Sequence, residues 1–418
     1  MNPPRIAEAS ISHMNGGHQQ TVALDDLGAL RITGIDAVRF LQGQLSNDIG
    51  RVSAERSLLA GLHNPQGRAI ALLRIVQLAP NDFLALLPQE LATAVAGRLA
   101  KYVLRAKVKV TDESPGWHIT GLIASGLGAA PGATGQAAST QAASAPLAGY
   151  PCASGEQRHL GATVVICIGE QPARWLLITP ARAAEANAPA AGDSAAVLPH
   201  GVPASRDVWR QLDIIAGLPQ IYGATSEEFV AQMLNLDVVG AIAFDKGCYT
   251  GQEVIARAHY RGRVKRRLQR FRSRAPLGLR PGDSGELTDG RAFKVVEAVQ
   301  MDDGRCEFLA VAPLPSTQPE LSAAAQPDAM LERVTAPLRP SLAGAAAVTR
   351  ANVGAPATGA ALHAAVPAEL TTTGAVWAPF ASSPAAPQRA GIPTLPASLP
   401  QELPHDLERL DLPYTLPD

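Results

Sequence analysis

The chain has 418 residues, of which 46% are apolar and only 4% are aromatic, and its formal net charge is −1. That length can hold two or three domains, although alanine-rich and proline-rich segments are expected to stay outside the folded core. The near-zero charge excludes a protein whose overall field steers it onto nucleic acid or an anionic membrane. The sequence has no apolar run of the ~20 residues that cross a bilayer, no secretory signal and no C-x-x-C pair, so it predicts a protein of the reducing cytoplasm.

The first part of the folded region is predicted to mix strands with helices in an α+β core over residues 21–262. Alternating apolar and polar residues, or short apolar runs beside turns, predict strands. These strands are expected at 21–33, 69–78, 83–87, 107–110, 117–123, 162–168 and 174–178. Apolar residues at helical spacing predict helices from Asp36 to about Asn47, over 91–103 and over 205–216.

Two capping boxes predict further helices later in this core. Thr225 and Glu228 have the spacing of the first box, which predicts a helix that continues through Leu234. Thr250 and Glu253 have the spacing of the second, which follows a short apolar strand expected at 241–244.

The remaining segments have compositions that predict other kinds of structure. Residues 1–20 are expected to be a flexible N-terminus, and the Ala/Gly/Ser/Thr-rich run at 124–150 a disordered insertion. Turns at 289–290 and 303–304, with β-rich flanks, predict a small β-barrel-like domain over 263–315. Residues 316–404 are rich in proline and alanine and are expected to be disordered. Alternation at 410–416 predicts a strand within 405–418 that returns to the β domain, with a loose tail as the alternative.

Cys248 is the main candidate for chemistry because it lies just before the predicted helix at Thr250. The partial positive charge of a helix N-terminus and the ammonium of Lys246 both favour a thiolate at this position. A thiolate attacks electrophiles and binds iron or zinc, so Cys248 is a candidate catalytic residue and metal ligand, with Lys246 as its catalytic partner. The alternative interpretation is a small cysteine that only packs.

The residues around Cys248 resemble the YgfZ family of folate-fold proteins that support iron–sulfur cluster assembly. Residues 246–253 read K-G-C-Y-T-G-Q-E and match the family's K-G-C-Y-x-G-Q-E motif at every fixed position. Residues 40–44, F-L-Q-G-Q, and 65–68, P-Q-G-R, also follow family motifs. The resemblance extends over roughly residues 21–313.

This resemblance implies a fold like that of the aminomethyltransferases of the glycine cleavage system, with α/β layers around a central channel that accepts tetrahydrofolate. It implies tetrahydrofolate as cofactor, a transient iron–sulfur cluster at Cys248, and iron–sulfur client or assembly proteins as partners. Candidate cofactor-binding residues are Asn47, Asp48, Tyr249, Gln252, Glu253, Arg257 and Arg261. Asn47 and Asp48 have an alternative role, which is to terminate the helix that precedes them.

One position departs from the folate-binding pattern. Many folate-binding relatives read L-E-A-G where this chain has Ile214-Ile215-Ala216-Gly217, so Ile215 replaces the glutamate that contacts the pterin. Asp213 is close in sequence, but two residues on a helix are separated by ~200° of rotation.

Residues 257–274 carry nine Lys or Arg residues and no Asp or Glu. Such a segment is expected to face an anion, which could be the folate glutamate tail, an RNA backbone or an acidic partner protein. An ordinary solvated strand face is the alternative. Few aromatic residues are interleaved with the charges, which argues against direct RNA binding.

The leading hypothesis is therefore an iron–sulfur cluster assembly or repair factor that binds reduced folate, uses Cys248 and need not be an enzyme. A folate-dependent one-carbon (aminomethyl) transferase is the first alternative. A factor in tRNA modification, acting through iron–sulfur enzymes that modify tRNA, is the second.

Overall fold

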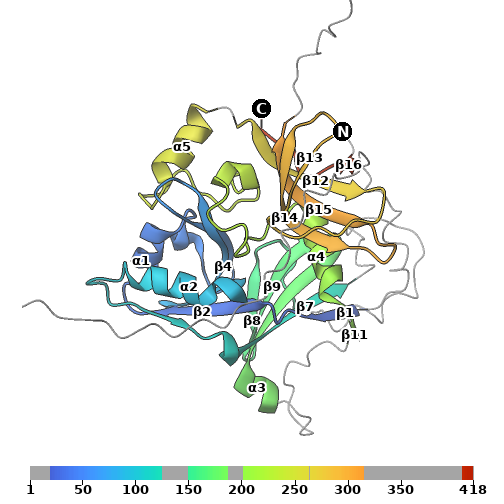
Figure 1. The fold of residues 1–418 in the computed structure, drawn as a ribbon. Coiled ribbons are helices and arrows are strands. Elements are labelled where there is room, and N and C mark those ends of the chain that lie inside the picture. Colours follow the sequence, from blue (N-terminus) through green and yellow to red (C-terminus); the bar gives the residue numbers. More distant parts are fainter. Residues whose placement is uncertain (1–18, 125–148, 187–200, 263, 315–406, 418) are drawn as a thin grey trace, which may run out of the picture. The chain divides into compact units, whose positions relative to one another are not determined.

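The computed structural model describes residues 19–124, 149–186, 201–262, 264–314 and 407–417 (Figure 1). The predicted insertion at 124–150, the predicted disordered segment at 316–404 and the predicted flexible N-terminus at 1–20 fall almost entirely outside these residues. The described residues all belong to one unit, which comprises 1–316 and 400–418. This unit is built from three largely antiparallel β-sheets and a small number of short helices.

The first sheet has five antiparallel strands in the order β3-β4-β5-β2-β6. Its elements are β2 (Leu27–Thr33), α1 (Ala37–Gln44), β3 (Leu58–His63), β4 (Ala69–Ala79), β5 (Asp82–Pro88), α2 (Gln89–Ala100) and β6 (Lys109–Asp112). Both faces of β5 are buried, since Phe83 and Leu87 pack with the helices while Leu84 and Leu86 face the core of the second sheet. This double burial explains the unbroken apolar run of the strand.

The second sheet has six strands in the order β11-β1-β7-β10-β9-β8, in which only the β1–β11 pair is parallel. Its strands are β1 (Gln19–Ala23), β7 (Trp117–Ala124), β8 (Gln157–Leu160), β9 (Thr163–Glu170), β10 (Ala173–Pro180) and β11 (Val202–Pro203). Helix α3 (Ala181–Ala186) follows β10, and α4 (Arg206–Ile215) buries Trp209 and Leu212 in the core of this sheet.

The third sheet has five antiparallel strands in the order β13-β14-β15-β12-β16. Helix α5 (Gln252–Tyr260) precedes β12 (Arg266–Ser273), β13 (Ser284–Glu286), β14 (Ala292–Gln300) and β15 (Cys306–Pro313), and β16 (Leu407–Leu410) completes the sheet. The rings of Phe271, Phe293 and Phe308 pack together in its core. Strand β16 pairs with β12, so residues far apart in the sequence share this sheet.

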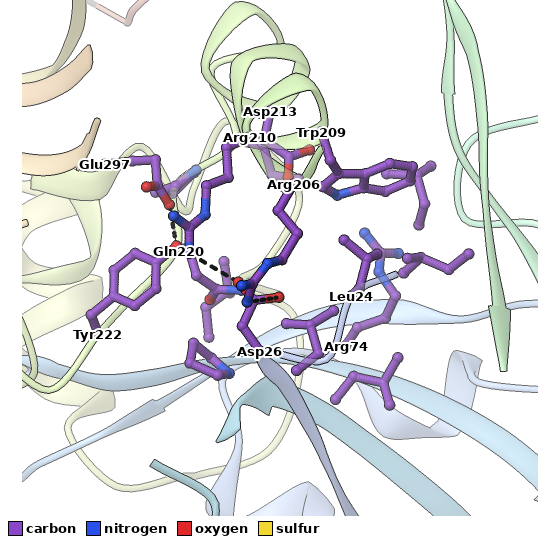
Figure 2. Close-up of a pocket in the computed structure, with 18 of the residues that line it drawn as sticks. Leu24, Asp26, Arg74, Arg206, Trp209, Arg210, Asp213, Gln220, Tyr222 and Glu297 are labelled. Atoms are coloured by element: carbon purple, nitrogen blue, oxygen red, sulfur yellow. Dashed lines mark hydrogen bonds and ion pairs between the residues drawn. The ribbon is translucent and has the colours of Figure 1, made fainter. Parts of the chain in front are cut away.

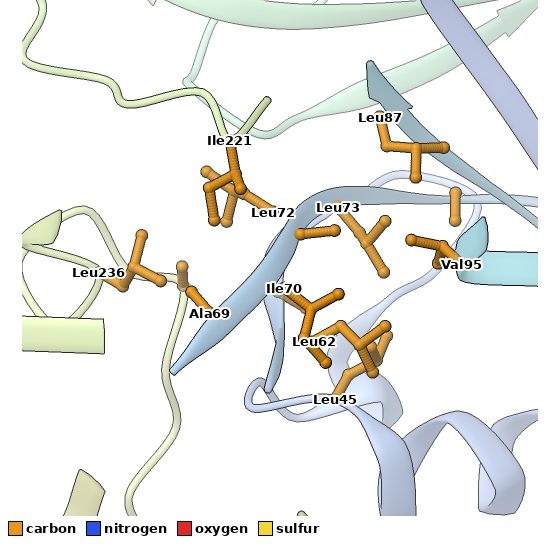
Figure 3. Packing of buried hydrophobic residues seen from close by; sticks show 14 of the residues in the cluster. Leu45, Leu62, Ala69, Ile70, Leu72, Leu73, Leu87, Val95, Ile221 and Leu236 are labelled. Carbon is orange, nitrogen blue, oxygen red and sulfur yellow. The ribbon is translucent and has the colours of Figure 1, made fainter. Parts of the chain in front are cut away.

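The largest apolar cluster joins the first sheet to the segment between α4 and α5 (Figure 3). Ile70 and Leu73 of β4 belong to this cluster, together with Leu45 at the end of α1. Ile221 and Leu236 reach it from the later segment. This packing brings the 40–48 region and the chain that leads to Cys248 onto the same strand.

The helix predicted after Thr225 does not form. Only a single 3₁₀ turn, Ala231–Leu234, is present in this region. The Thr225 hydroxyl accepts a hydrogen bond from the Tyr222 amide, and Glu227 has a positive φ of 62°, which interrupts helical geometry. Thr225 therefore stabilises a turn, although its spacing to Glu228 is that of a helix capping box.

Three other predicted elements differ in detail. Residues 241–243 are buried and Phe244 is half-buried, but the segment forms no strand, and the Ala243 amide donates to the Ser46 carbonyl oxygen. Helix α5 forms where it was expected, but its N-cap is Gly251 and no side chain caps it. The strand that returns to the β domain is β16 (Leu407–Leu410), which lies earlier in the sequence than the predicted 410–416. Leu412 and Tyr414, within the predicted range, contact the fold without forming a strand.

Candidate functional site

The Cys248 loop, defined here as residues 245–251, connects the irregular segment at 241–244 to α5. The Cys248 side chain is exposed, whereas the adjacent Tyr249 is buried. This alternation turns Tyr249 into the fold and presents the thiol at the surface.

Lys246 fixes the loop to the end of α1. Its Nζ atom donates to three carbonyl oxygens, at 2.8 Å from Gln42, 2.6 Å from Leu45 and 2.7 Å from Asn47. The last carbonyls of a helix have no partner within the helix, and an ammonium group has three protons to offer. Burial lowers the pKa of Lys246 to about 8, and the Asp48 carboxylate opposes this shift. The ammonium protons are thus used on α1, and the predicted effect of Lys246 on the Cys248 thiolate stays a prediction.

Two glycines fix the other end of the loop. Gly251 has a φ of +82°, and a Cβ atom there would lie 2.5 Å from the carbonyl oxygen of Asn64. Gly67 has a φ of +72°, and a Cβ atom there would lie 3.0 Å from the Cβ of Val254. Because glycine avoids both penalties, the 64–67 turn and the start of α5 can meet backbone to backbone. The motifs at 40–48, 64–68 and 246–253 therefore form one assembly.

Beneath the loop lies a pair of buried polar rings. The Tyr249 ring is 6.4 Å from the His63 ring, and the Lys246 ammonium lies 5.2 Å from the Tyr249 ring centre. Burial raises the pKa of Tyr249 to about 12 and lowers that of His63 to about 3, so both rings are neutral at physiological pH. Among the described residues, the Tyr249 hydroxyl and both ring nitrogens of His63 have no hydrogen-bond partner.

The side chains of Asn47 and Asp48 connect backbone segments. The Asn47 amide nitrogen donates to the carbonyl oxygens of Leu59 (2.6 Å) and Gly240 (2.8 Å). The Asp48 carboxylate accepts from Gln42 and from the Gly50 amide. These contacts agree with the alternative in which the two residues terminate α1.

The remaining predicted cofactor residues lie on or after α5, which is labelled in Figure 1. Gln252 is half-buried at its first position. Glu253 and Arg257 form a 3.0 Å ion pair with side chains that are 84% and 72% exposed, and Arg261 is exposed after the helix.

Carboxylates of the fold neutralise much of the basic segment at 257–274. Arg267 forms a buried ion pair with Asp237 at 3.0 Å. Arg270 and Arg272 both bind Glu307. The anion that this segment was expected to need is therefore supplied in part by neighbouring elements.

A separate cavity lies where the three sheets meet (Figure 2). It contains about 820 Å³ of empty space, a volume that includes its open side. Its apolar lining comes from Leu24, Leu27, Leu59, Leu72, Leu86, Pro88, Ile168, Leu176, Trp209, Leu218 and Pro219. None of the cofactor-binding residues predicted from the sequence lines this cavity.

Helix α4 supplies one polar wall of the cavity. Arg206, Trp209, Arg210 and Asp213 recur at helical spacing and line it together (Figure 2). Ile215 does not belong to the lining and packs in the core of the second sheet instead. The carboxylate that α4 presents therefore comes from Asp213.

Most charged groups of the cavity are paired. Arg174 donates to Asp213 at 2.7 Å, and Arg210 donates to Asp26 at 2.9 Å. The Tyr222 hydroxyl donates to Glu297 at 2.5 Å. Burial raises the pKa of Glu297 to about 7, which Tyr222 and Arg210 oppose. Burial also raises the pKa of Asp213, with Arg174 opposing.

The sequence analysis missed Arg74 and Glu297, although both carry a signal. Each is a charged residue within an otherwise apolar stretch of a buried strand. A charge in such a place is costly unless it has a partner or faces a cavity, so it marks a candidate site.

Within the described ranges, no group of three or more His, Cys, Asp or Glu side chains could hold a metal ion. No helix in the same ranges combines the length and apolar character needed to cross a membrane.

The fold is that of the aminomethyltransferases, as the sequence predicted. The chain is similar to the crystal structure of glycine cleavage system aminomethyltransferase T from Bartonella henselae, with a TM-score of 0.53 and 16% identity. The match covers 71% of this chain and 79% of that one. Heterotetrameric sarcosine oxidase from Corynebacterium sp. U-96 matches at a TM-score of only 0.28 and 14% identity, over 44% of this chain and 89% of that one. No protein-family model matches the sequence.

Proposed function

We propose that this chain is a folate-binding iron–sulfur cluster assembly or repair factor of the YgfZ type, with Cys248 as its functional thiol. The observation that carries this proposal is an exposed cysteine on a loop fixed at both ends. Lys246 ties the loop to α1, and Gly251 ties it to the 64–67 turn. A cysteine that only packs would need neither exposure nor such anchoring.

The absence of a metal-ligand group around Cys248 in the described part of the chain supports transfer or repair rather than storage of a cluster. Protein-bound iron–sulfur clusters are generally held by four ligands. A single exposed thiolate can supply one of them, while a client or assembly protein supplies the others.

The cavity where the three sheets meet has a lining that suits a reduced folate. A pterin ring offers N–H donors, and Asp213 and Glu297 are carboxyl groups that face the cavity. Trp209 and Tyr222 provide aromatic surface, and the leucine side chains provide an apolar wall for the aminobenzoyl ring. These residues would hold the folate, which would supply a one-carbon unit or a reduced pterin.

A one-carbon transferase is the second candidate, and the aminomethyltransferase fold supports it. Glu297 adds a group that can exchange a proton near neutral pH at the cavity surface. Turnover of 5,10-methylenetetrahydrofolate by the purified chain would favour this alternative over an assembly factor.

Complementation tests the proposal. A strain that lacks this protein is supplied with the wild type, Cys248→Ser or Cys152→Ser, and the activity of iron–sulfur enzymes is measured. Cys152 is the matched control, because it is the other exposed free cysteine among the described residues. We expect Cys152→Ser to rescue fully and Cys248→Ser to fail, although both variants should melt like the wild type. Full rescue by a stable Cys248→Ser protein would refute the role of the thiol.

A further inference from the structure

The arginines that line the cavity differ in how their charge is balanced. Arg206 lies 3.1 Å from Asp25, and Arg210 lies 2.9 Å from Asp26. Arg74, by contrast, makes no hydrogen bond and no ion pair with any described residue. Its guanidinium is the one cavity cation in the described part of the chain that lacks a bound carboxylate.

Asp213 is the carboxylate that acts electrostatically on Arg74, but Arg174 already binds it. Arg174 donates to Asp213 at 2.7 Å and lies 5.1 Å from the centre of the Trp209 ring. Among Arg74, Arg174 and Asp213 there are thus two cations and one carboxylate, and the carboxylate is bound by Arg174 alone. Burial lowers the pKa of Arg74 to about 10, with Arg174 adding to the shift and Asp213 opposing it, so the excess charge persists at neutral pH.

The surroundings of Arg74 are apolar. Leu59 on β3 and Leu86 on β5 are its cross-strand partners on β4. Leu72 stands two residues before it, on the same face of the strand. All three leucines line the cavity with Arg74, which is labelled among the lining residues in Figure 2. A cation set in such a face is costly for the free protein, unless a ligand with an apolar body brings an anion to it.

We propose that Arg74 binds the carboxylate of an apolar, aromatic ligand in this cavity. Within the proposed folate-binding function, on which this identification rests, that group is a carboxylate of the glutamate tail. The tail then lies against β4, and the pterin ring is left to Tyr222 and Glu297, which belong to other elements of the lining. The planar guanidinium matches a carboxylate with two parallel hydrogen bonds.

Binding of two tailored probes tests this inference in the full chain. N-(4-aminobenzoyl)-L-glutamate has the apolar ring and the carboxylates but no pterin, and 4-aminobenzamide is its uncharged control. We expect the first to bind the wild type and the second not to bind measurably. In Arg74→Gln, affinity for the glutamate probe should fall by at least about tenfold, which is the loss expected for one charge-assisted contact. Arg74→Lys should retain part of it.

Arg206→Gln is the matched control, because it removes a cavity arginine whose charge Asp25 already balances. It should change affinity for the probe less than about threefold. Thermal unfolding gives an independent readout: the free Arg74→Gln protein should melt at the same or a higher temperature than the wild type, since an unbalanced, half-buried charge is gone.

Unchanged affinity in Arg74→Gln, or no binding of the glutamate probe to the wild type, would overturn the inference. So would a lower melting temperature of the free Arg74→Gln protein, because it would mean that the fold itself pairs the charge. Binding of tetrahydrofolate with unchanged affinity by Arg74→Gln would leave the proposed function intact. If the probe binds in an Arg74-dependent way but tetrahydrofolate does not bind at all, folate is refuted as the ligand, whereas the carboxylate site at Arg74 is supported.

Discussion

Replacement of Lys246 by methionine tests whether the ammonium anchors the Cys248 loop. Methionine keeps the length of the side chain but leaves the carbonyls of Gln42, Leu45 and Asn47 without their donor. Each charge-assisted bond contributes about 1.5 kcal/mol at a site that solvent reaches in part. The substitution also removes the desolvation cost of the ammonium, which is about 2 kcal/mol after a discount for solvent screening. The net loss in the free energy of unfolding is then about 2.5 kcal/mol.

Such a loss lowers the melting temperature by roughly 5 to 10 °C in a domain of this size. Urea unfolding measures the free energy directly. Lys294→Met is the matched control, because Lys294 makes a single surface ion pair with Glu228 at 2.6 Å. It should cost less than about 1 kcal/mol. A Lys246→Met protein as stable as the control would refute the anchoring role, and full rescue of iron–sulfur enzymes by it would show that the anchor is dispensable for function.

Three further changes have defined outcomes. Gly251→Ala should lower the free energy of unfolding by about 3 kcal/mol or more, because its Cβ would meet the Asn64 oxygen at 2.5 Å. Gly240 also has a positive φ but no close neighbour, so Gly240→Ala should cost only about 1 kcal/mol, and equal losses in the two variants would contradict the steric contact at Gly251. Since burial raises the pKa of Glu297 from 4.5 to about 7, the folded state retains a proton that the unfolded chain releases, and stability should fall by up to about 3 kcal/mol as pH rises from 4.5 through 7. The lowered pKa of His63 makes stability rise with pH, which opposes the effect of Glu297. The test is therefore the difference in unfolding free energy between the wild type and Glu297→Gln from pH 4.5 to 7, and a difference that does not change with pH would argue against the raised pKa of Glu297. Tyr414→Phe removes the hydroxyl that donates to the Gly217 carbonyl at 2.7 Å and should cost about 1 to 2 kcal/mol in chemical denaturation; no loss would mean that water replaces the bond.

Local patterns in the sequence predicted the fold class and most of the elements. The helix expected at 205–216 is α4, Arg206–Ile215, because its apolar spacing matches its burial. The capping box at Thr225 was misleading, since the same residue types also build turns and only the Tyr222 contact decides between them. Strand 241–244 failed for a related reason: an apolar run predicts burial but does not supply a partner strand.

The sites were harder to predict because their contacts are long-range. The sequence identified Cys248 and Lys246, but the three oxygens that bind the ammonium lie about two hundred positions away. The carboxylate in the cavity depends on the rotation of α4, which the packing of Trp209 and Leu212 sets. Comparison by position therefore showed only that Ile215 replaces a glutamate, and the rotation of a helix argued against Asp213, whereas α4 does present Asp213 to the cavity.

Strand β16 has a consequence for how the protein folds during synthesis. One edge of β12 is completed only by residues 407–410, and Tyr414 then reaches Gly217. A ribosome must therefore add residues 407–410 before this edge is covered, although the other partner of β12, strand β15, emerges about a hundred residues earlier. In the interval β12 offers unpaired backbone groups to any neighbouring chain, so slow translation between β15 and β16 should favour aggregation of nascent chains.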